Sequence, residues 1–352
     1  MKKIIKLLLA TGLFVAVAGF IFSSCTKEGP QGAPGTNGKD GKDGLSAITC
    51  QECHNFSDTI VAKIFQYDAS RHATGSTLLE ASNNQCAPCH SSQGFAEVLA
   101  TGAFKTAAGI TDAAPINCRT CHQIHKTYTN ADWTLATTAP YRMRYDSTVT
   151  VNLAGSGGTA NLCGRCHQAR AANPPLTNPS SNTDSINITS TRWGPHHGPQ
   201  SNVLSGRGAY NDGAFRDSPH KDLIGCINCH GRNAQGNLVG GHTLIMTSSE
   251  TGDNFAVCLN SSCHPDATSF DVDGKQTEIQ GLYQQLKVKL AAFNMLDTNQ
   301  MLINKKKYAQ ADLAVFWNFM LVDADRSMGV HNYKYTYDLL QDGITHFTSK
   351  GY

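Results

Sequence analysis

The sequence predicts a mainly α-helical fold with much irregular coil, completed by a helical C-terminal layer. Three observations predict it. A Cys-x-x-Cys-His pentapeptide occurs five times between Cys50 and His230, and one longer form of the motif follows. The motifs are irregularly spaced, which excludes a fixed-period solenoid, and short apolar stretches lie between them. After the last motif, apolar residues recur at helical spacing in 277–296, 308–321 and 333–340.

The pentapeptide has the spacing of c-type haem attachment. Two cysteines three apart can both form thioethers to one haem, and the histidine that follows can reach its iron. A shuffled chain of this composition would contain about 0.02 such pentapeptides, so five are not an accident. The predicted thioether cysteines are Cys50, Cys53, Cys86, Cys89, Cys118, Cys121, Cys163, Cys166, Cys226, Cys229, Cys258 and Cys263. The predicted proximal iron ligands, which also name the motifs below, are His54, His90, His122, His167, His230 and His264.

Other uses of paired cysteines fit less well. Zinc ribbons need two cysteine pairs per metal and no histidine directly after the second cysteine. Disulfides inside the pentapeptides would be strained and redox-active. In the longer motif a plain disulfide between Cys258 and Cys263 stays an alternative, although His264 follows directly and favours haem. The prediction is therefore six haem c groups, whose apolar discs form most of the core.

The N-terminus reads as an export signal. Lys2, Lys3 and Lys6 precede an apolar run at 7–22, and Ser-Ser-Cys25 follows it. This resembles the lipobox of bacterial lipoproteins, in which the cysteine becomes the lipidated first residue, although Phe22 replaces the usual leucine. We expect an exported protein that is lipid-anchored through Cys25 to a membrane, with the outer membrane or cell surface favoured.

A collagen-like Gly-x-y segment follows the anchor, with glycine at every third position from Gly29 to Gly44. Six triplets are too few to hold a triple helix unaided, so we expect an extended tether, with a trimerising stalk as the alternative. The predicted regions are a signal peptide at 1–24, the tether at 25–48, the haem region at 49–269 and the helical region at 270–352. Within the haem region we expect helices at 59–67 and 94–99, a strand at 148–153 and a surface excursion at 173–191.

Eight histidines lie outside the motifs, enough for a second axial ligand on each haem. His125 follows His122 by three residues on nearly the same helical face, so it cannot complete the same iron and is expected to ligate a neighbouring haem. His196 and His197 are expected to supply one ligand and one propionate partner, and His346 is expected on a helix surface. The distal candidates from this pattern are His72, His125, His196, His197, His220 and His242.

The repeated motifs, the Cys-x-x-Cys-His-x-x-His form at Cys118–His125 and the stretch Asp325-Arg-Ser-Met-Gly-Val-His331-Asn332 resemble multihaem cytochromes c. The last stretch is similar to the nitrite-reductase-like group, in which the histidine of Gly-Val-His is a distal ligand. The resemblance thus implies a haem-packed multihaem cytochrome c fold and adds His331 to the distal candidates. Ammonia-forming nitrite reductases commonly present a catalytic haem through Cys-x-x-Cys-Lys, which this sequence lacks, so their activity does not transfer.

The expected function is electron transfer through six haems that are mostly or all bis-histidine, with redox partner proteins or extracellular electron acceptors. A carrier is favoured over an enzyme. The alternatives are a reductase of a small nitrogen or sulfur oxyanion at one open haem, and a subunit of a cytochrome filament; a homotrimer also stays open. Haem propionates would make the formal charge of +2 negative, and the chain has no basic stripe, so we expect no nucleic-acid binding.

Overall fold

Three long C-terminal helices surround the main hydrophobic core. The computed structural model describes residues 54, 57–75, 77–210, 216–259 and 263–352, which belong to one compact unit. The leader, Cys25, the Gly-x-y segment, Cys50 and Cys53 lie outside the described residues. Among the residues described, no helix is long and apolar enough to cross a membrane.

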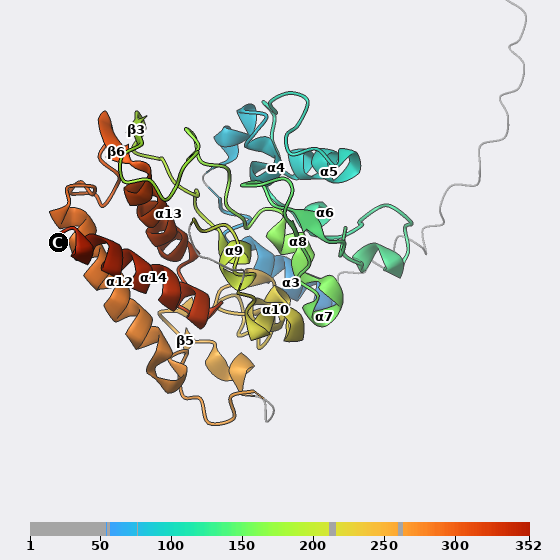
Figure 1. Ribbon diagram of the computed structural model, residues 1–352. Helices are drawn as coiled ribbons and strands as arrows, with labels where there is room; N and C mark the ends of the chain where they lie inside the picture. The colour runs from blue at the N-terminus through green and yellow to red at the C-terminus, as the bar shows by residue number, and fades with distance from the viewer. Residues whose placement is uncertain (1–53, 55–56, 76, 211–215, 260–262) are drawn as a thin grey trace, which may run out of the picture. The chain divides into compact units, whose positions relative to one another are not determined.

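The three helices confirm the predicted C-terminal layer (Figure 1). They are α12 (Lys275–Ala292), α13 (Gln310–Asp325) and α14 (Tyr333–Ser349). Asn332 caps α14, because its side-chain oxygen accepts the backbone N–H of Tyr335 at 3.2 Å. Arg326 ends α13 in the left-handed conformation. Helix α13 is buried on almost every side, which explains its nearly continuous apolar sequence.

The main core joins these helices to the loops that precede them. Trp317 of α13 is 1% exposed and donates its indole N–H to the carbonyl of Gly208 at 2.8 Å. The hydroxyl of Tyr335 on α14 accepts the N–H of Ala209 at 3.0 Å. Trp193 packs its ring edge-on to Trp317 with centroids 5.8 Å apart. The middle of the chain is thus held against the C-terminal layer by apolar burial and by buried hydrogen bonds.

The predicted surface excursion at 173–191 is partly wrong. Strand β3 (Ser185–Ile188) pairs antiparallel with β6 (Lys306–Ala309), and Ile188 is fully buried. The pairing uses a partner more than a hundred residues later, which local composition does not reveal. It also explains why the predicted helix at 308–321 begins two residues late, since Tyr308 belongs to the strand.

The rest of the described chain consists of short elements joined by coil. The predicted helices at 59–67 and 94–99 are confirmed, and the strand at 148–153 is confirmed at its centre. The α-helices here are α3 (Asp58–Asp68), α4 (Ala87–His90), α5 (Ser92–Thr101), α6 (Cys118–Cys121), α7 (Gly155–Gly158), α8 (Ala160–Gly164), α9 (Gln200–Leu204), α10 (Pro219–Leu223) and α11 (Cys226–His230). The 3-10 helices are η1 (Leu78–Ser82), η2 (Asn130–Trp133), η3 (Gly241–Thr243), η4 (Phe255–Cys258) and η5 (Val272–Gly274). Two further antiparallel pairs are β1 (Tyr141–Arg142) with β2 (Thr150–Val151) and β4 (Thr247–Ser248) with β5 (Gly252–Asp253).

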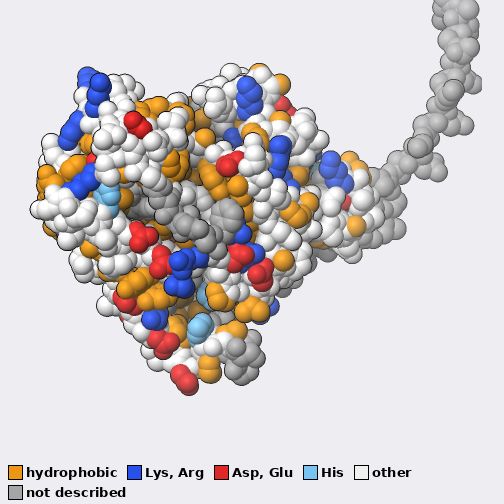
Figure 2. Space-filling view, in the orientation of Figure 1, with side chains coloured by type: hydrophobic (Ala, Val, Ile, Leu, Met, Phe, Trp, Pro, Cys, Tyr) orange, Lys and Arg blue, Asp and Glu red, His pale blue; other side chains and the backbone are white. Residues whose placement is uncertain are grey.

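Protein side chains form little core in the first part of the described chain. Of the described residues, none before Tyr141 belongs to either hydrophobic cluster. Several large apolar side chains there are exposed, including Phe65 at 56% and Leu79 at 88%. On the face drawn in Figure 2, apolar side chains lie among Lys, Arg, Asp and Glu side chains. The mainly helical, coil-rich fold class is confirmed. The exposed apolar side chains in the first part of the chain are what we expect of a polypeptide that wraps large apolar groups.

Candidate functional site

Each of the six motif histidines lies opposite one histidine from outside the motifs. The two members of a pair come from different parts of the chain. The ring centroids are separated by 6.1 Å in His54–His125, 6.1 Å in His167–His72, 6.3 Å in His90–His196, 6.2 Å in His122–His242, 6.4 Å in His230–His331 and 6.3 Å in His264–His220.

This separation fits two axial ligands on one iron. Two imidazole nitrogens at about 2 Å from a metal, each roughly 1 Å from its ring centre, place the ring centres about 6 Å apart. Direct stacking of two rings, by contrast, would bring them closer. The motif cysteines fit thioether attachment as well, because the ten in the described residues are all free and Cys258 is not disulfide-bonded to Cys263.

His125 faces the histidine of another motif. Its ring lies 6.1 Å from that of His54, while His122 of its own motif faces His242. The Tyr128 ring stacks on His125 at 5.4 Å, and His125 has a positive φ of 63°. The carboxylate of buried Asp132 accepts the N–H groups of Thr127 and Tyr128 and so holds this turn. The turn directs His125 away from the haem that its neighbouring motif would attach.

The partner of His122 is held through α3. Gln66 of α3 accepts the backbone N–H of His242 with its side-chain oxygen at 3.0 Å. His122 itself is oriented by the carbonyl of Trp133, which accepts a hydrogen bond from Nδ1 at 2.6 Å. The backbone at Trp133 therefore orients His122, and Gln66 of α3 positions His242.

The pair His167–His72 lies beside a close contact at the motif. Gly164, inside the motif, packs against the hydroxyl end of the Tyr141 side chain, where a Cβ would clash. His167 Nδ1 bonds the side-chain oxygen of Gln200 at 3.0 Å, and Gln200 in turn donates to the carbonyls at the end of α13. The C-terminal layer thus orients a histidine from the middle of the chain.

His196, and not His197, faces a motif histidine. His196 lies opposite His90, whose Nδ1 bonds the hydroxyl of Thr77 at 2.9 Å. His197 contacts only the ring of His196 among the ring contacts of the described residues, at 5.6 Å. The Trp-Gly-Pro-His-His stretch therefore offers one ring for an axial position, and the propionate role expected for the other stays a prediction.

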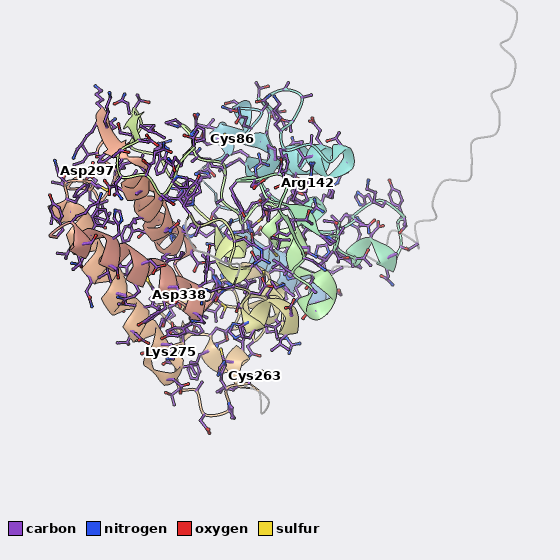
Figure 3. All side chains as sticks on the ribbon, viewed as in Figure 1. Cys86, Arg142, Cys263, Lys275, Asp297 and Asp338 are labelled. Carbon is purple, nitrogen blue, oxygen red and sulfur yellow. The ribbon has the colours of Figure 1, made fainter. Side chains whose placement is uncertain are left out.

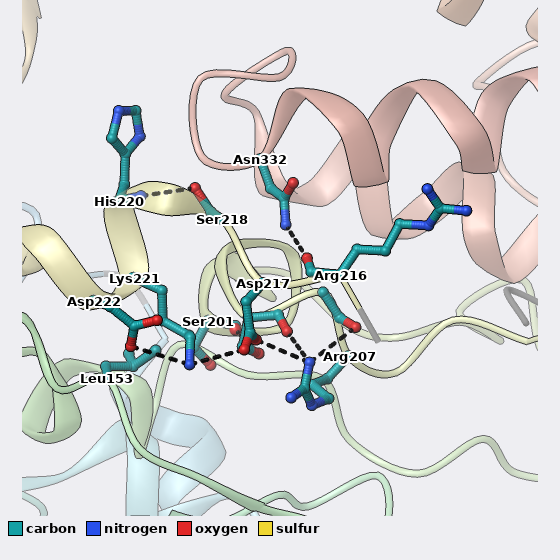
Figure 4. Close-up of polar contacts among 12 residues, drawn as sticks. Leu153, Ser201, Arg207, Arg216, Asp217, Ser218, His220, Lys221, Asp222 and Asn332 are labelled. Carbon is teal, nitrogen blue, oxygen red and sulfur yellow. Dashed lines mark hydrogen bonds and ion pairs between the residues drawn. The ribbon is translucent and has the colours of Figure 1, made fainter. Parts of the chain in front are cut away.

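The pair His264–His220 depends on the start of α14 (Figure 4). Ser218 caps α10 by accepting the N–H of His220 at 3.2 Å. The side chain of Asn332 donates to the carbonyl of Arg216 at 2.6 Å, which ties the segment before α10 to the cap of α14. Lys221 pairs with Asp217 at 3.0 Å and closes the turn.

The last pair, His230–His331, has a carboxylate against one ring. His331 Nδ1 donates to Oδ1 of Asp325 at 2.6 Å, and the carbonyl of Leu244 accepts from His230 Nδ1 at 2.9 Å. Gly329 precedes His331 with φ of +95°, and a Cβ there would lie 2.9 Å from Ile279. Glycine is required because both the conformation and the space exclude a side chain.

Four of the paired rings are in a form that suits iron binding. Carbonyl oxygens accept from Nδ1 of His122 and His230, so the proton is on Nδ1 and the Nε2 lone pair is free. Burial lowers the pKa of His72 and of His196 to about 4, and the nearby Arg170 guanidinium adds to the effect on His196. Both rings are therefore neutral at pH 7, and neutral imidazole is the metal-binding form.

His346 has a different environment. It is half-buried on α14, and its Nε2 bonds Oδ1 of buried Asp312 at 2.7 Å. The expectation of a helix-surface residue is therefore only partly right. Its ring nitrogen already has a partner, and no motif histidine faces it among the ring contacts of the described residues.

Sulfur atoms of different motifs lie next to one another. The side chain of Cys89 lies within interaction distance of Cys166, and that of Cys163 lies within interaction distance of Cys226. Cys121 lies close enough to Cys163 to interact with it electrostatically. Helix α11, which carries the His230 motif, packs against α8 and against η4 of the His264 motif. In Figure 3, Cys86 and Cys263 lie far apart in the view, so the motifs extend across the unit.

Sequence reasoning missed the groups that orient the histidines. Trp133 and Leu244 act through backbone carbonyls, which carry no sequence signal. Gln200 and Thr77 lie far along the chain from the rings they bond. Asp325 alone had a usable signal, since it opens the stretch that ends at His331.

Comparisons with known proteins do not assign the chain to a family. No protein-family model matches the chain, and no curated protein matches its sequence. A solved structure described as the outer cell wall cytochrome OcwA is similar, with 20% identity and a TM-score of 0.49. The match covers 81% of this chain and 50% of that one, so this chain spans about half the length of that protein. The histidine pairs therefore remain the basis for assigning a cofactor.

Proposed function

We propose that this protein is a hexahaem c-type cytochrome that transfers electrons. The observation that carries the proposal is the one-to-one pairing of six motif histidines with six other histidines at 6.1–6.4 Å. Each haem would be held by two thioether cysteines and by the two histidines of one pair. The haem supplies the redox chemistry, and the protein supplies spacing, axial ligands and burial. Bis-histidine ligation favours lower potentials than histidine–methionine ligation.

The motif contacts support a continuous route for electrons. Each thioether sulfur is attached at the edge of its haem, so neighbouring sulfurs place haem edges side by side. The His167 motif has neighbours at the His90, His122 and His230 motifs, through the sulfur contacts described above. The His54 haem joins through His125, and the His264 haem joins through α11 and η4. The proposed route is thus a line through the His54, His122, His167, His230 and His264 haems, with the His90 haem as a branch.

A carrier is favoured over an enzyme. A reductase of a small nitrogen or sulfur oxyanion needs an iron with one open position where the substrate binds and meets proton donors. Here all six motif histidines have a partner ring, so each iron would have both positions filled. Full ligation suits a carrier, because the iron then changes little in geometry on reduction.

Intact-mass measurement of the denatured protein should show six haem additions, and the oxidised native protein should show only low-spin haem. The reduced protein should bind little carbon monoxide and pass electrons to redox dyes without consuming nitrite or hydroxylamine. Six additions are expected because each motif has both thiols and its histidine.

The mass measurement and the spin-state measurement test different parts of the proposal. A mass with five haem additions would mean that the Cys258–Cys263 motif does not attach haem, and the route would then contain five haems. A high-spin fraction of about one haem in six, with matching carbon monoxide binding, would overturn the carrier proposal and make the open haem a reductase site.

We also propose that the protein is exported and anchored to a membrane at the cell surface by lipid on Cys25. The support is in the sequence, where the lipobox-like Ser-Ser-Cys25 ends an apolar leader and the Gly-x-y tether follows. Redox partners, whether proteins or extracellular acceptors, would then reach the haems from outside the cell.

The Cys25→Ala variant should appear in the soluble fraction, whereas the native chain should remain with membranes. Lipid on this cysteine supplies the membrane affinity, so its removal should release the holoprotein with its six haems intact. Fractionation with haem staining measures this. Membrane retention of the variant would contradict the lipid anchor, and a trimer on sedimentation of the released protein would favour a trimerising stalk over a simple tether.

A further inference from the structure

Asp325 is a buried carboxylate in contact with an axial histidine candidate. It is the last residue of α13 and is 3% exposed. Its Oδ1 accepts from His331 Nδ1 at 2.6 Å, and its Oδ2 accepts from the hydroxyl of Ser327 at 2.5 Å. The hydroxyl of Ser327 also accepts the backbone N–H of His331 at 3.1 Å. The turn between α13 and α14 thus holds the carboxylate and the ring in one orientation.

Among the described residues no lysine or arginine lies against the charge of Asp325, and its partner His331 must be neutral if Nε2 of that ring binds iron. Over the described part of the chain, the lysine and arginine ion pairs involve other carboxylates, and the ion-pair partner of Asp325 is His331. A buried carboxylate without a compensating positive charge is costly. The iron–porphyrin centre of a ferric haem, apart from its propionates, carries one net positive charge, because the porphyrin dianion balances two of the three charges of the iron. A ferric haem on His331 would supply the missing charge, and a ferrous haem would not.

The other oriented histidines bond neutral oxygens. His122 and His230 donate to backbone carbonyls, His167 bonds an amide oxygen and His90 bonds a hydroxyl. Among the paired histidines of the described chain, His331 is the one whose ring bonds a carboxylate. A carboxylate draws the Nδ1 proton away from the ring, which makes Nε2 a stronger electron donor to the metal.

We propose that Asp325 is a positioning residue that lowers the reduction potential of the haem at His230 below those of the other haems. The inference rests on the proposed ligation of that haem by His230 and His331. Stronger donation from the ring and the nearby negative charge both stabilise the ferric state. In the proposed route this haem lies between the His167 and His264 haems. The His230 haem would be the last to be reduced, and electrons would have to move to this lower potential before they reach the His264 haem at the end of the route.

The Asp325→Asn variant tests this with little change in shape. The amide keeps the size of the side chain and a hydrogen-bonding oxygen but removes the charge. In a redox titration followed by absorbance and by EPR, one haem in six should become easier to reduce by about tenfold, which is 59 mV for one electron. That haem should stay low-spin, which shows that His331 is still bound and that the change is electronic.

Asp312 provides a matched control. It is also a buried carboxylate on α13, at 3% exposure, and it bonds a histidine at 2.7 Å, but that histidine is His346, which faces no motif histidine in the described chain. The Asp312→Asn variant should leave all six potentials unchanged. Equal shifts in both variants would mean a general effect of losing a buried charge and would overturn the proposal.

The outcomes also separate this inference from the proposed function. If the Asp325→Asn variant has six low-spin haems with unchanged potentials, the proposed cytochrome function stands and the proposed role of Asp325 is wrong. A mass lacking one haem, with the His230 motif shown unmodified by peptide mapping, would instead remove the ligation on which the inference rests. A fall in the potential would contradict the electronic argument directly.

Discussion

Replacing His125 with alanine should convert about one haem in six from low spin to high spin, and the opened haem should be that of His54. The ring of His125 lies 6.1 Å from that of His54, at the separation that two axial ligands require. Its own motif histidine, His122, already faces His242. Loss of the imidazole leaves one axial position open, and an iron with one histidine is high-spin and binds carbon monoxide.

A double variant shows whether His125 and His242 serve different irons. His242→Ala alone should also open one haem, since it faces His122. If the two histidines serve different irons, the double variant His125→Ala/His242→Ala opens two haems in six. A double variant with only one open haem would mean that both serve the same iron, against the pairing in the structure.

His197 supplies the control for these substitutions. It is adjacent to His196, which faces His90, but it faces no motif histidine in the described residues. His197→Ala should therefore keep every haem low-spin, whereas His196→Ala should open one. High-spin signal in His197→Ala would show that loss of any histidine near a haem disturbs its ligation, and the spin-state test would then lose its specificity.

Production of the chain without haem attachment should leave its first part unfolded while the C-terminal layer keeps its helices. Among the described residues, the two hydrophobic clusters begin at Tyr141, and the larger one is built mostly from α12, α13 and α14. Exposed side chains such as Phe65 and Leu79 would be buried by haem rather than by protein. Without haem, burial in 57–140 is too small to offset the loss of chain entropy.

Hydrogen exchange with peptide resolution measures this difference. A chain expressed without its leader stays in the cytoplasm, where haem is not attached, and should lose amide protection by several orders of magnitude at 57–140. Helices α13 and α14 should keep partial protection, since Trp317, Tyr335 and Phe347 belong to one hydrophobic cluster built from protein side chains. The exported holoprotein is the control. Native-like protection of 57–140 in the haem-free chain would show that the polypeptide makes its own core there.

Much of the fold was predictable because its signals are local. The apolar spacing of the three C-terminal helices and of α3 and α5 can be found within one window of sequence. The pairing of β3 with β6 was not predictable, since strand partners lie far apart along the chain. The same holds for the groups behind the rings, such as Gln200 and the carbonyl of Leu244.

The sequence by itself determined where the proposed haem-attachment motifs lie, because two thiols and a histidine at this spacing are a local covalent requirement. The sequence also predicted that His125 and His122 serve different irons, but its argument from a shared helical face was wrong, because His122 is extended and His125 is left-handed. Only the tertiary structure decided which histidine faces which motif, that His196 and not His197 faces a motif histidine, and that Asp325 reaches His331. These relations join segments distant in sequence, and their distances depend on how α13, α14 and the loops pack, which no local pattern specifies.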